Sequence, residues 1–310
     1  MGIYLLKRIG ITLLVLFTIS LVVFTSLSFM PGDPARIILG QSASDEAVQR
    51  LREELGLNDP LLERYGRYMI GVLQGDFGDS YDGREPVTAA ISRSFPITLR
   101  IALIATVISV LIGVFLGVLA AVKQYSLFDN IVVFFTTIIA SVPAFLVAFA
   151  FILILAVNLH LLPTSGLRSW QGYILPILSL SIGGISSVTR LTRALMLDVL
   201  DSDFARTARA KGASERRVVF KHVLKNALIP LLTNIGMMLG GLMGGAVVLE
   251  RVYALPGLGS LAVEGLNGKN APVVMGCILL MAFLSCFINL VVDIGNAFID
   301  PRIKSEYARK

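Results

Sequence analysis

Long stretches without a charged residue, each near the length of a membrane-spanning helix, dominate the pattern along this chain. About 20 apolar residues cross a bilayer as an α-helix, so six such runs predict six spans. The fourth run is the weakest, because it is short and contains Pro176, Gly183 and Gly184. The runs are Ile9–Met30, Ile101–Val122, Ile131–Leu167, Tyr173–Thr189, Ala227–Leu249 and Ala271–Val292.

The charges between these runs predict the orientation of the chain. Lys and Arg exceed Asp and Glu by two to none in Met1–Arg8, nine to four in Arg190–Asn226 and four to two in Asp300–Lys310. Pro31–Pro96 is acidic instead, with seven basic and eleven acidic residues. Basic residues concentrate in short cytoplasmic segments, so both termini are expected in the cytoplasm and Pro31–Pro96 outside. The net charge of +6 is therefore a signal of topology and not of nucleic-acid binding.

The external segment Pro31–Pro96 predicts a small helical cap over the mouth of the bundle. Apolar residues recur at helical spacing from Ala43 to Leu73, and Gly56 to Pro60 divides this stretch into two helices. Ser44 is the expected N-cap of the first helix. The cap either shields helix ends or contacts a delivery protein or cargo, and the sequence leaves both open.

A polar, basic segment from Asp203 to Pro230, called the elbow below, separates two apolar runs. Its pattern predicts a short helix, a turn at Gly212 and a second amphipathic helix that leads into the bilayer. Its basic residues could grip anionic lipid. However, Phe204, Ala205 and Ala208 form no continuous apolar stripe, and small side chains of this kind fit a groove on a protein partner.

Motifs for catalysis are missing from the sequence. It has no G-x-x-x-x-G-K-[ST] phosphate loop, no H-E-x-x-H and no G-x-S-x-G. We therefore expect a conduit and not an enzyme, with no catalytic, cofactor-binding or metal site in this chain. Asp293, directly after the last run, is an ionisable residue near the membrane, and Arg190 and Arg193 are its candidate partners.

Small and kink-forming residues in the third, fourth and fifth runs either line a translocation path or let helices pack closely. The packing interpretation is favoured, because Gly240 and Gly244 have the small-xxx-small spacing that brings helix backbones together. The candidates for path or packing are Ser141, Pro143, Ser179, Ser181, Gly240, Gly241, Gly244 and Gly245.

Several motifs resemble those of one protein family. In the elbow, RTARAKG (206–212) is followed by KHVLKNA (221–227); MPGDPA (30–35), GDFG (75–78), LPGLG (255–259) and DPRI (300–303) are spread over the rest of the chain. Together they resemble the permease subunits of binding-protein-dependent type I ABC importers, in the dipeptide/oligopeptide/nickel branch. The general E-A-A triplet of the wider family reads Arg206-Thr207-Ala208 here, a departure typical of this branch.

The resemblance implies an all-α polytopic fold: residues 1–30 form the first span, 31–96 the cap, and 97–310 a five-helix permease core that contains a cytoplasmic coupling loop at 190–226. It implies that the elbow docks on a cytoplasmic ATPase through Phe204, Arg206, Thr207, Ala208, Arg209, Lys211, Gly212 and Ala213. Ala208 and Gly212 would allow close approach, with Arg206, Arg209 and Lys211 at the rim.

The implied partners are a second, related permease, two ATPases that hold ATP and Mg²⁺, and an external binding protein, all at the inner membrane of a prokaryote. The chain would form half of a path for peptides, a glutathione-like solute or a nickel chelate, and the motifs do not distinguish these cargoes. A secondary transporter or channel is the alternative class. It would show inverted repeats or midplane charges, and neither is seen.

Overall fold

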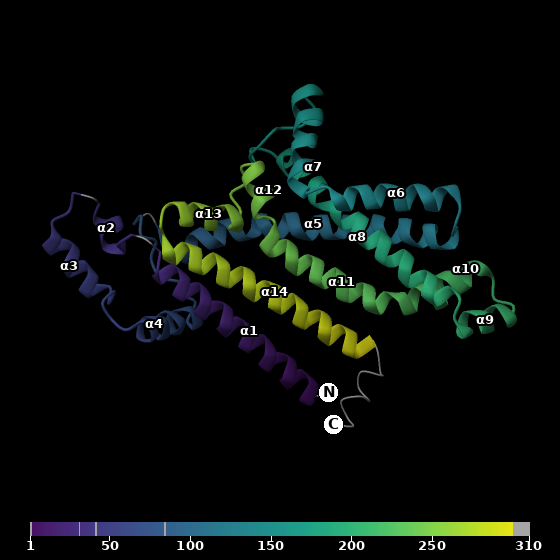
Figure 1. The fold of residues 1–310 in the computed structure, drawn as a ribbon, viewed down its shortest axis with the longest axis horizontal. Helices are drawn as coiled ribbons and strands as arrows, with labels where there is room; N and C mark the ends of the chain where they lie inside the picture. The colour runs from purple at the N-terminus through teal and green to yellow at the C-terminus, as the bar shows by residue number, and fades with distance from the viewer. Residues whose placement is uncertain (1, 31, 41, 84, 300–310) are drawn as a thin grey trace.

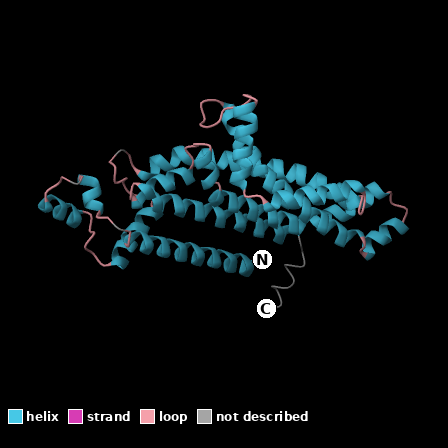
Figure 2. Cartoon of the chain, turned by 45° about the horizontal axis from the view of Figure 1, so that its top comes forward, coloured by secondary structure: helices cyan, strands magenta, loops and turns pink. Residues whose placement is uncertain are grey.

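Helices form most of the chain in the computed structural model, which describes residues 2–30, 32–40, 42–83 and 85–299 (Figures 1 and 2). The motif DPRI and the remainder of the C-terminal tail lie outside the described residues. The elements include two short π-helical segments, η1 and η3, and one 3₁₀ segment, η2. In chain order they are α1 (Gly2–Ser28), α2 (Pro34–Leu39), α3 (Asp45–Glu54), α4 (Leu61–Leu73), α5 (Val87–Val122), α6 (Leu127–Ser141), α7 (Ala144–Phe151), η1 (Ile152–Asn158), η2 (Trp170–Tyr173), α8 (Ile174–Leu200), α9 (Asp203–Ala210), α10 (Glu215–Arg217), η3 (Val218–Val223), α11 (Leu224–Gly245), α12 (Val247–Val252), α13 (Leu258–Asn267) and α14 (Ala271–Ile299).

Four of these helices, α1, α5, α8 and α14, are long and apolar enough to cross a membrane by themselves. Two bent pairs also pass this test: Leu127–Ser141 with Ala144–Asn158, and Glu215–Leu228 with Pro230–Gly244. Counting each bent pair as one span gives the six spans that the hydropathy pattern predicts. The fold is an all-α polytopic membrane protein.

The third predicted span is not a straight helix. The chain turns by 100° between Ser141 and Ala144, so that α7 stands away from the bundle (Figure 1). Pro143 causes this break, because proline lacks an N–H and forces the residue before it into an extended conformation. Val142 has that conformation, with φ −94° and ψ 122°.

The fourth span, expected to be the weakest, is a continuous helix of 27 residues, α8. Its Pro176 lies in the first turn, where the missing N–H leaves no hydrogen bond unmade. Its Gly184 lies against α5: a Cβ atom there would be 2.2 Å from Ser109 Oγ. The residues that weaken the sequence signal therefore suit a helix start and a close helix contact.

The close contact between α5 and α8 forms the centre of the bundle. A Cβ atom at Gly113 would lie 2.7 Å from Val188 Cβ, and one at Gly117 would lie 2.6 Å from Thr192 Cβ. Only glycine fits at these two positions, which are one turn apart on α5. The two glycines let side chains of α8 pack directly against the backbone of α5.

The cap contains α2, α3 and α4, and it packs against the end of α1 (Figure 1). The predicted N-cap is confirmed: Ala47 N donates to Ser44 Oγ at 3.3 Å. Tyr65 of α4 is buried, its hydroxyl lies 2.7 Å from Ser20 Oγ of α1, and its ring meets Phe24 edge-on. The cap is thus fastened to the first span and does not merely lie over the mouth.

The expected partners of Asp293 are wrong. Asp293 pairs with Arg8 at 3.0 Å, joining the first turns of α1 to the last turns of α14. Arg193 instead makes a bidentate pair with Asp129 of α6, at 2.6 and 2.8 Å. Sequence spacing cannot choose among these basic residues, because helix packing decides which of them reaches each carboxylate.

The loop that contains LPGLG folds around a buried carboxyl group, that of Glu250 on α12. Thr98 Oγ1 of α5 donates to Glu250 Oε1 at 2.6 Å, and the Ser260 backbone N–H donates to Oε2 at 2.9 Å. A Cβ atom at Gly257 would lie 2.2 Å from Oε1. The first glycine of LPGLG therefore makes room for this carboxyl group, and the sequence analysis did not single out Glu250.

The Gly257→Ala variant should lower the thermal stability of the purified chain, because its methyl group would displace a buried, hydrogen-bonded carboxyl group. Overpacking of this kind costs about 1–3 kcal/mol. Gly66→Ala is the matched control, since nothing lies within 4 Å of a Cβ atom there. A melting temperature equal to that of the control would show that the loop does not depend on this contact.

Candidate functional site

The elbow projects from the end of α8 as the short helix α9, a turn, and then α10 and η3 (Figure 1). The short helix predicted before Gly212 is confirmed, as Asp203–Ala210. Two hydrogen bonds close its end: Gly212 N–H donates to Arg209 O at 2.9 Å, and Ala213 N–H donates to Ala208 O at 3.1 Å. This is the Schellman pattern, with glycine in the left-handed conformation at φ +78°.

No atom of the described residues lies within 4 Å of the position that a Cβ atom would take at Gly212. Glycine is therefore needed here for its backbone conformation and not for intramolecular space. The predicted turn is confirmed, and it sets the angle between α9 and α10.

Arg209 fixes the elbow internally. Its guanidinium donates from Nε to Glu215 Oε1 at 2.8 Å and from Nη1 to the Leu200 carbonyl at 3.1 Å. The Arg209 side chain thus connects the end of α8 with α9 and α10, the helices before and after the turn. The sequence predicted Arg209 at the rim of a docking surface. That prediction is incomplete, because the guanidinium also makes hydrogen bonds within the chain.

The small apolar residues of α9 also face the chain's own core. Ala205 is fully buried, and Ala208 and Ala213 are half-buried against a cluster that includes Met196 and Val218. Ala208 is therefore used in packing within the chain, and its close approach to a partner stays a prediction. Small side chains at this face let α9 lie directly against α8 and η3.

The outward face of the elbow carries aromatic and basic side chains. Phe204 is 44% exposed and Phe220 is 56% exposed, and both are large apolar residues in a strongly polar segment. Arg206, Thr207, Lys211 and Gly212 are exposed beside Phe204 in the chain. An open hollow of about 380 Å³ lies between Ser214, Arg216, Arg217 and Phe220.

The predicted docking set therefore divides into two groups. Phe204, Arg206, Thr207, Lys211 and Gly212 face outward, whereas Ala208, Arg209 and Ala213 hold the elbow together. The sequence analysis missed Phe220. Its signal was an aromatic residue within a basic segment, but only the fold shows that the side chain is exposed beside the turn.

The candidates for a path or for helix packing do not lie on one surface. Ser179 and Ser181 are buried: Ser179 Oγ lies 2.8 Å from the Tyr253 hydroxyl, and Ser181 Oγ donates to the Ile177 carbonyl at 2.7 Å. Ser141 and Pro143 are exposed at the bend between α6 and α7.

The glycines of α11 also divide. Gly240 packs within the chain, where its carbonyl accepts from Ser285 Oγ of α14 at 2.8 Å. Gly241 and Gly244 have nothing within 4 Å of a Cβ position. Gly245 is the last residue of α11, and the structure does not describe its surroundings.

An open stripe of small and polar residues runs along α8. Gly183, Ser187 and Arg190 are exposed at i, i+4 and i+7. Met237, Gly241 and Gly244 form a similar exposed stripe on α11. The two helices touch beside these stripes, where a Cβ atom at Gly184 would lie 3.3 Å from Met238 Sδ. Polar groups on a spanning helix avoid lipid, so this open surface suits a protein partner or a water-filled path.

Within residues 2–299, apart from the undescribed positions 31, 41 and 84, no group of three or more His, Cys, Asp or Glu side chains could hold a metal ion. The exposed elbow and the open stripes on α8 and α11 remain as the candidate functional surfaces.

Comparison with known proteins identifies the family. The pattern described as "Binding-protein-dependent transport system inner membrane component" matches residues 113–305, and its N-terminal companion matches residues 1–102. The chain is 40% identical over 301 residues to the glutathione transport system permease protein GsiC of Escherichia coli (strain K12), covering 97% of this chain and 98% of that protein. The GsiC protein of Salmonella paratyphi A matches with the same identity and coverage.

Among solved structures, the inward-facing MetNI methionine ABC transporter has a similar fold, with a TM-score of 0.58 and 22% identity over 68% of this chain and 96% of that one. At this identity the likeness concerns the fold alone. The chain therefore belongs to the binding-protein-dependent transport system inner membrane component family, as a permease subunit of a type I ABC importer of the peptide/nickel kind.

Proposed function

We propose that this permease carries a small peptide of the glutathione type across the inner membrane, driven by ATPases that dock on the elbow. The observation that carries the docking site is an exposed aromatic and basic face on an internally fixed turn. Phe204 and Phe220 are about half exposed, while Arg209 and Ala205 hold the same segment to the bundle. A partner that buries these rings gains hydrophobic contact, and the basic residues supply a polar rim.

Transport requires that movement of the elbow be transmitted to the membrane spans. Ala205, Val218 and Val223 are buried in one cluster with Val118 of α5 and Met196 of α8. Packed interiors resist compression, so a displaced elbow carries the ends of α5 and α8 with it. We infer alternating access in which closure of two ATPases moves two elbows together and pivots the spans.

The energy for this motion would come from ATP and Mg²⁺ bound in the ATPase subunits, since this sequence has no phosphate loop. An external binding protein would deliver the cargo. A second permease would complete the path, and the open stripes through Ser187 of α8 and Gly241 of α11 are the surface we assign to that partner or to the path.

The cargo proposal rests on the 40% identity to a glutathione permease over nearly the whole of both chains. Cells that express the complete transport system should take up labelled glutathione, and unlabelled glutathione should compete. Partner ATPases with the phosphate-loop lysine replaced are the control and should abolish uptake. Saturable uptake of nickel or of a dipeptide, without uptake of glutathione, would contradict this choice of cargo.

Replacing Gly212 with Val should abolish ATPase binding and uptake while membrane insertion persists. A β-branched residue resists the φ of +78°, at a cost of about 1–3 kcal/mol, and would redirect α9. Pull-down of the ATPases and uptake in proteoliposomes would measure the effect.

Gly212→Asn is the matched control for this variant, because asparagine has a similar bulk but accepts the left-handed conformation. It should retain most ATPase binding. If both variants bind and transport like the wild type, the elbow does not couple the two subunits. If both fail equally, bulk at this surface matters and the turn does not.

We also infer that both termini and the elbow lie in the cytoplasm, as the distribution of basic residues favours. In a background with Cys277 and Cys286 replaced by alanine, cysteine at exposed Gln74 of the cap should react with an impermeant maleimide in intact cells. Cysteine at exposed Ser214 should react only after the membrane is opened. Labelling of Ser214→Cys in intact cells would refute this orientation.

A further inference from the structure

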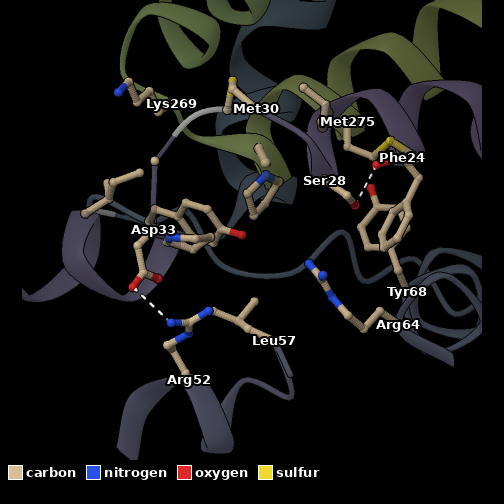
Figure 3. A pocket seen from close by; sticks show the side chains of 17 residues that line it. Phe24, Ser28, Met30, Asp33, Arg52, Leu57, Arg64, Tyr68, Lys269 and Met275 are labelled. Atoms are coloured by element: carbon tan, nitrogen blue, oxygen red, sulfur yellow. Dashed lines mark hydrogen bonds and ion pairs between the residues drawn. The ribbon is translucent and has the colours of Figure 1, made fainter. Parts of the chain in front are cut away.

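A pocket of about 430 Å³ lies where the cap meets the ends of α1 and α14 (Figure 3). Its wall includes Phe24 and Leu27 of α1, Ile37 of α2, Arg52 of α3 and Met275 of α14. The volume is within the range of small-molecule sites, about 300–1,000 Å³. The proposed transport function assigns no role to this pocket, which is separate from the elbow and from the stripes on α8 and α11.

The charges around the pocket are unbalanced. Arg52, Arg64 and Lys269 line it, whereas Asp33 is the single acidic residue among its described lining residues. Asp33 is already engaged, since its Oδ1 caps α2 by accepting from the Ala35 N–H and its Oδ2 lies 3.8 Å from Arg52. Arg64 lies over the Phe24 ring, with 6.0 Å between its central carbon and the ring centroid.

Two polar atoms of the lining are buried and have no hydrogen-bond partner among the described residues, Arg52 Nε and Tyr68 Oη. A buried donor without an acceptor costs about 1–3 kcal/mol, so such groups are usually satisfied by a ligand or by water. Burial raises the pKa of Tyr68 and of Tyr81, the second phenol of the wall. Both phenols therefore stay protonated and are able to donate.

We propose that this pocket binds an oxyanion, a phosphate or carboxylate group, through Arg52, Arg64 and the Tyr68 hydroxyl. Charge-assisted hydrogen bonds from arginine suit such a group. Because the pocket lies at the ends of two spans and is partly walled by apolar residues, the headgroup of an anionic phospholipid is the source that we favour. The chemistry is the same for a soluble oxyanion, and the experiment separates the two sources.

Purified full-length chain would be titrated with dioctanoyl phosphatidylglycerol and, separately, with inorganic phosphate, with binding followed by native mass spectrometry. Arg64→Gln removes one cation and breaks no ion pair among the described residues. It should weaken binding about tenfold, the effect of losing one charged hydrogen bond. Arg64→Lys should retain most of the affinity. Arg50→Gln is the matched control, because Arg50 is exposed on the neighbouring α3 and does not line the pocket.

Met275→Trp is a second variant that fills the pocket without touching a charge, and it should also weaken binding. Loss of phosphatidylglycerol binding in both variants supports the site with a lipid source. The same dependence with inorganic phosphate alone supports the site with a soluble source. No binding of either probe, or equal affinity in Arg64→Gln and Arg50→Gln, overturns the proposal.

Discussion

The contact between α5 and α8 at Gly113 and Gly117 is the constraint on which the other helices depend. At both positions a Cβ atom would lie closer than 3 Å to a side chain of α8. Membranes provide little hydrophobic drive for helices to associate, so close packing at small residues and interhelical hydrogen bonds must supply it. With α5 and α8 fixed as one unit, α11 and α14 pack on one side of it and α6 and α7 on the other.

This unit extends beyond the membrane. At about 1.5 Å per residue, the 36 residues of α5 span about 54 Å, well over the roughly 30 Å of a bilayer core. Both α5 and α8 contribute residues to the apolar cluster that contains Ala205 of α9. Arg193 of α8 also donates a hydrogen bond to Asp129 at the start of α6. The elbow is therefore attached to the closely packed pair of α5 and α8, as the proposed coupling to an ATPase requires.

Two buried carboxyl groups, those of Glu250 and Asp129, have hydrogen-bond partners near the ends of the spans. Glu250 accepts hydrogen bonds from α5 and α13 at one end, and Asp129 is bound by Arg193 at the other. An unpaired charge at these depths is costly, so each pair fixes a loop to a helix end. The pocket beneath the cap differs from these sites, since it combines three cationic side chains with two buried polar atoms, Arg52 Nε and Tyr68 Oη, that have no hydrogen-bond partner among the described residues. This difference supports the proposal that the pocket is a ligand site.

The sequence by itself indicated the apolar runs that become spanning helices or bent helix pairs, the helical cap with Ser44 as the N-cap of α3, and the elbow with its turn at Gly212. These features depend on local properties: long apolar runs, capping residues, and the freedom of glycine at positive φ. The family followed from short motifs of the same local kind. Local chemistry was sufficient because each signal lies within a few consecutive residues.

Only the tertiary structure decided which residues face each other. It paired Asp293 with Arg8, buried Ser179 and Ser181, and turned Ala208 and Arg209 inward while leaving Phe220 exposed. Spacing along a helix groups residues on a face but does not say what that face meets. The partner of each face is set by contacts between segments far apart in the chain, such as Glu250 with Thr98, and no local pattern encodes them.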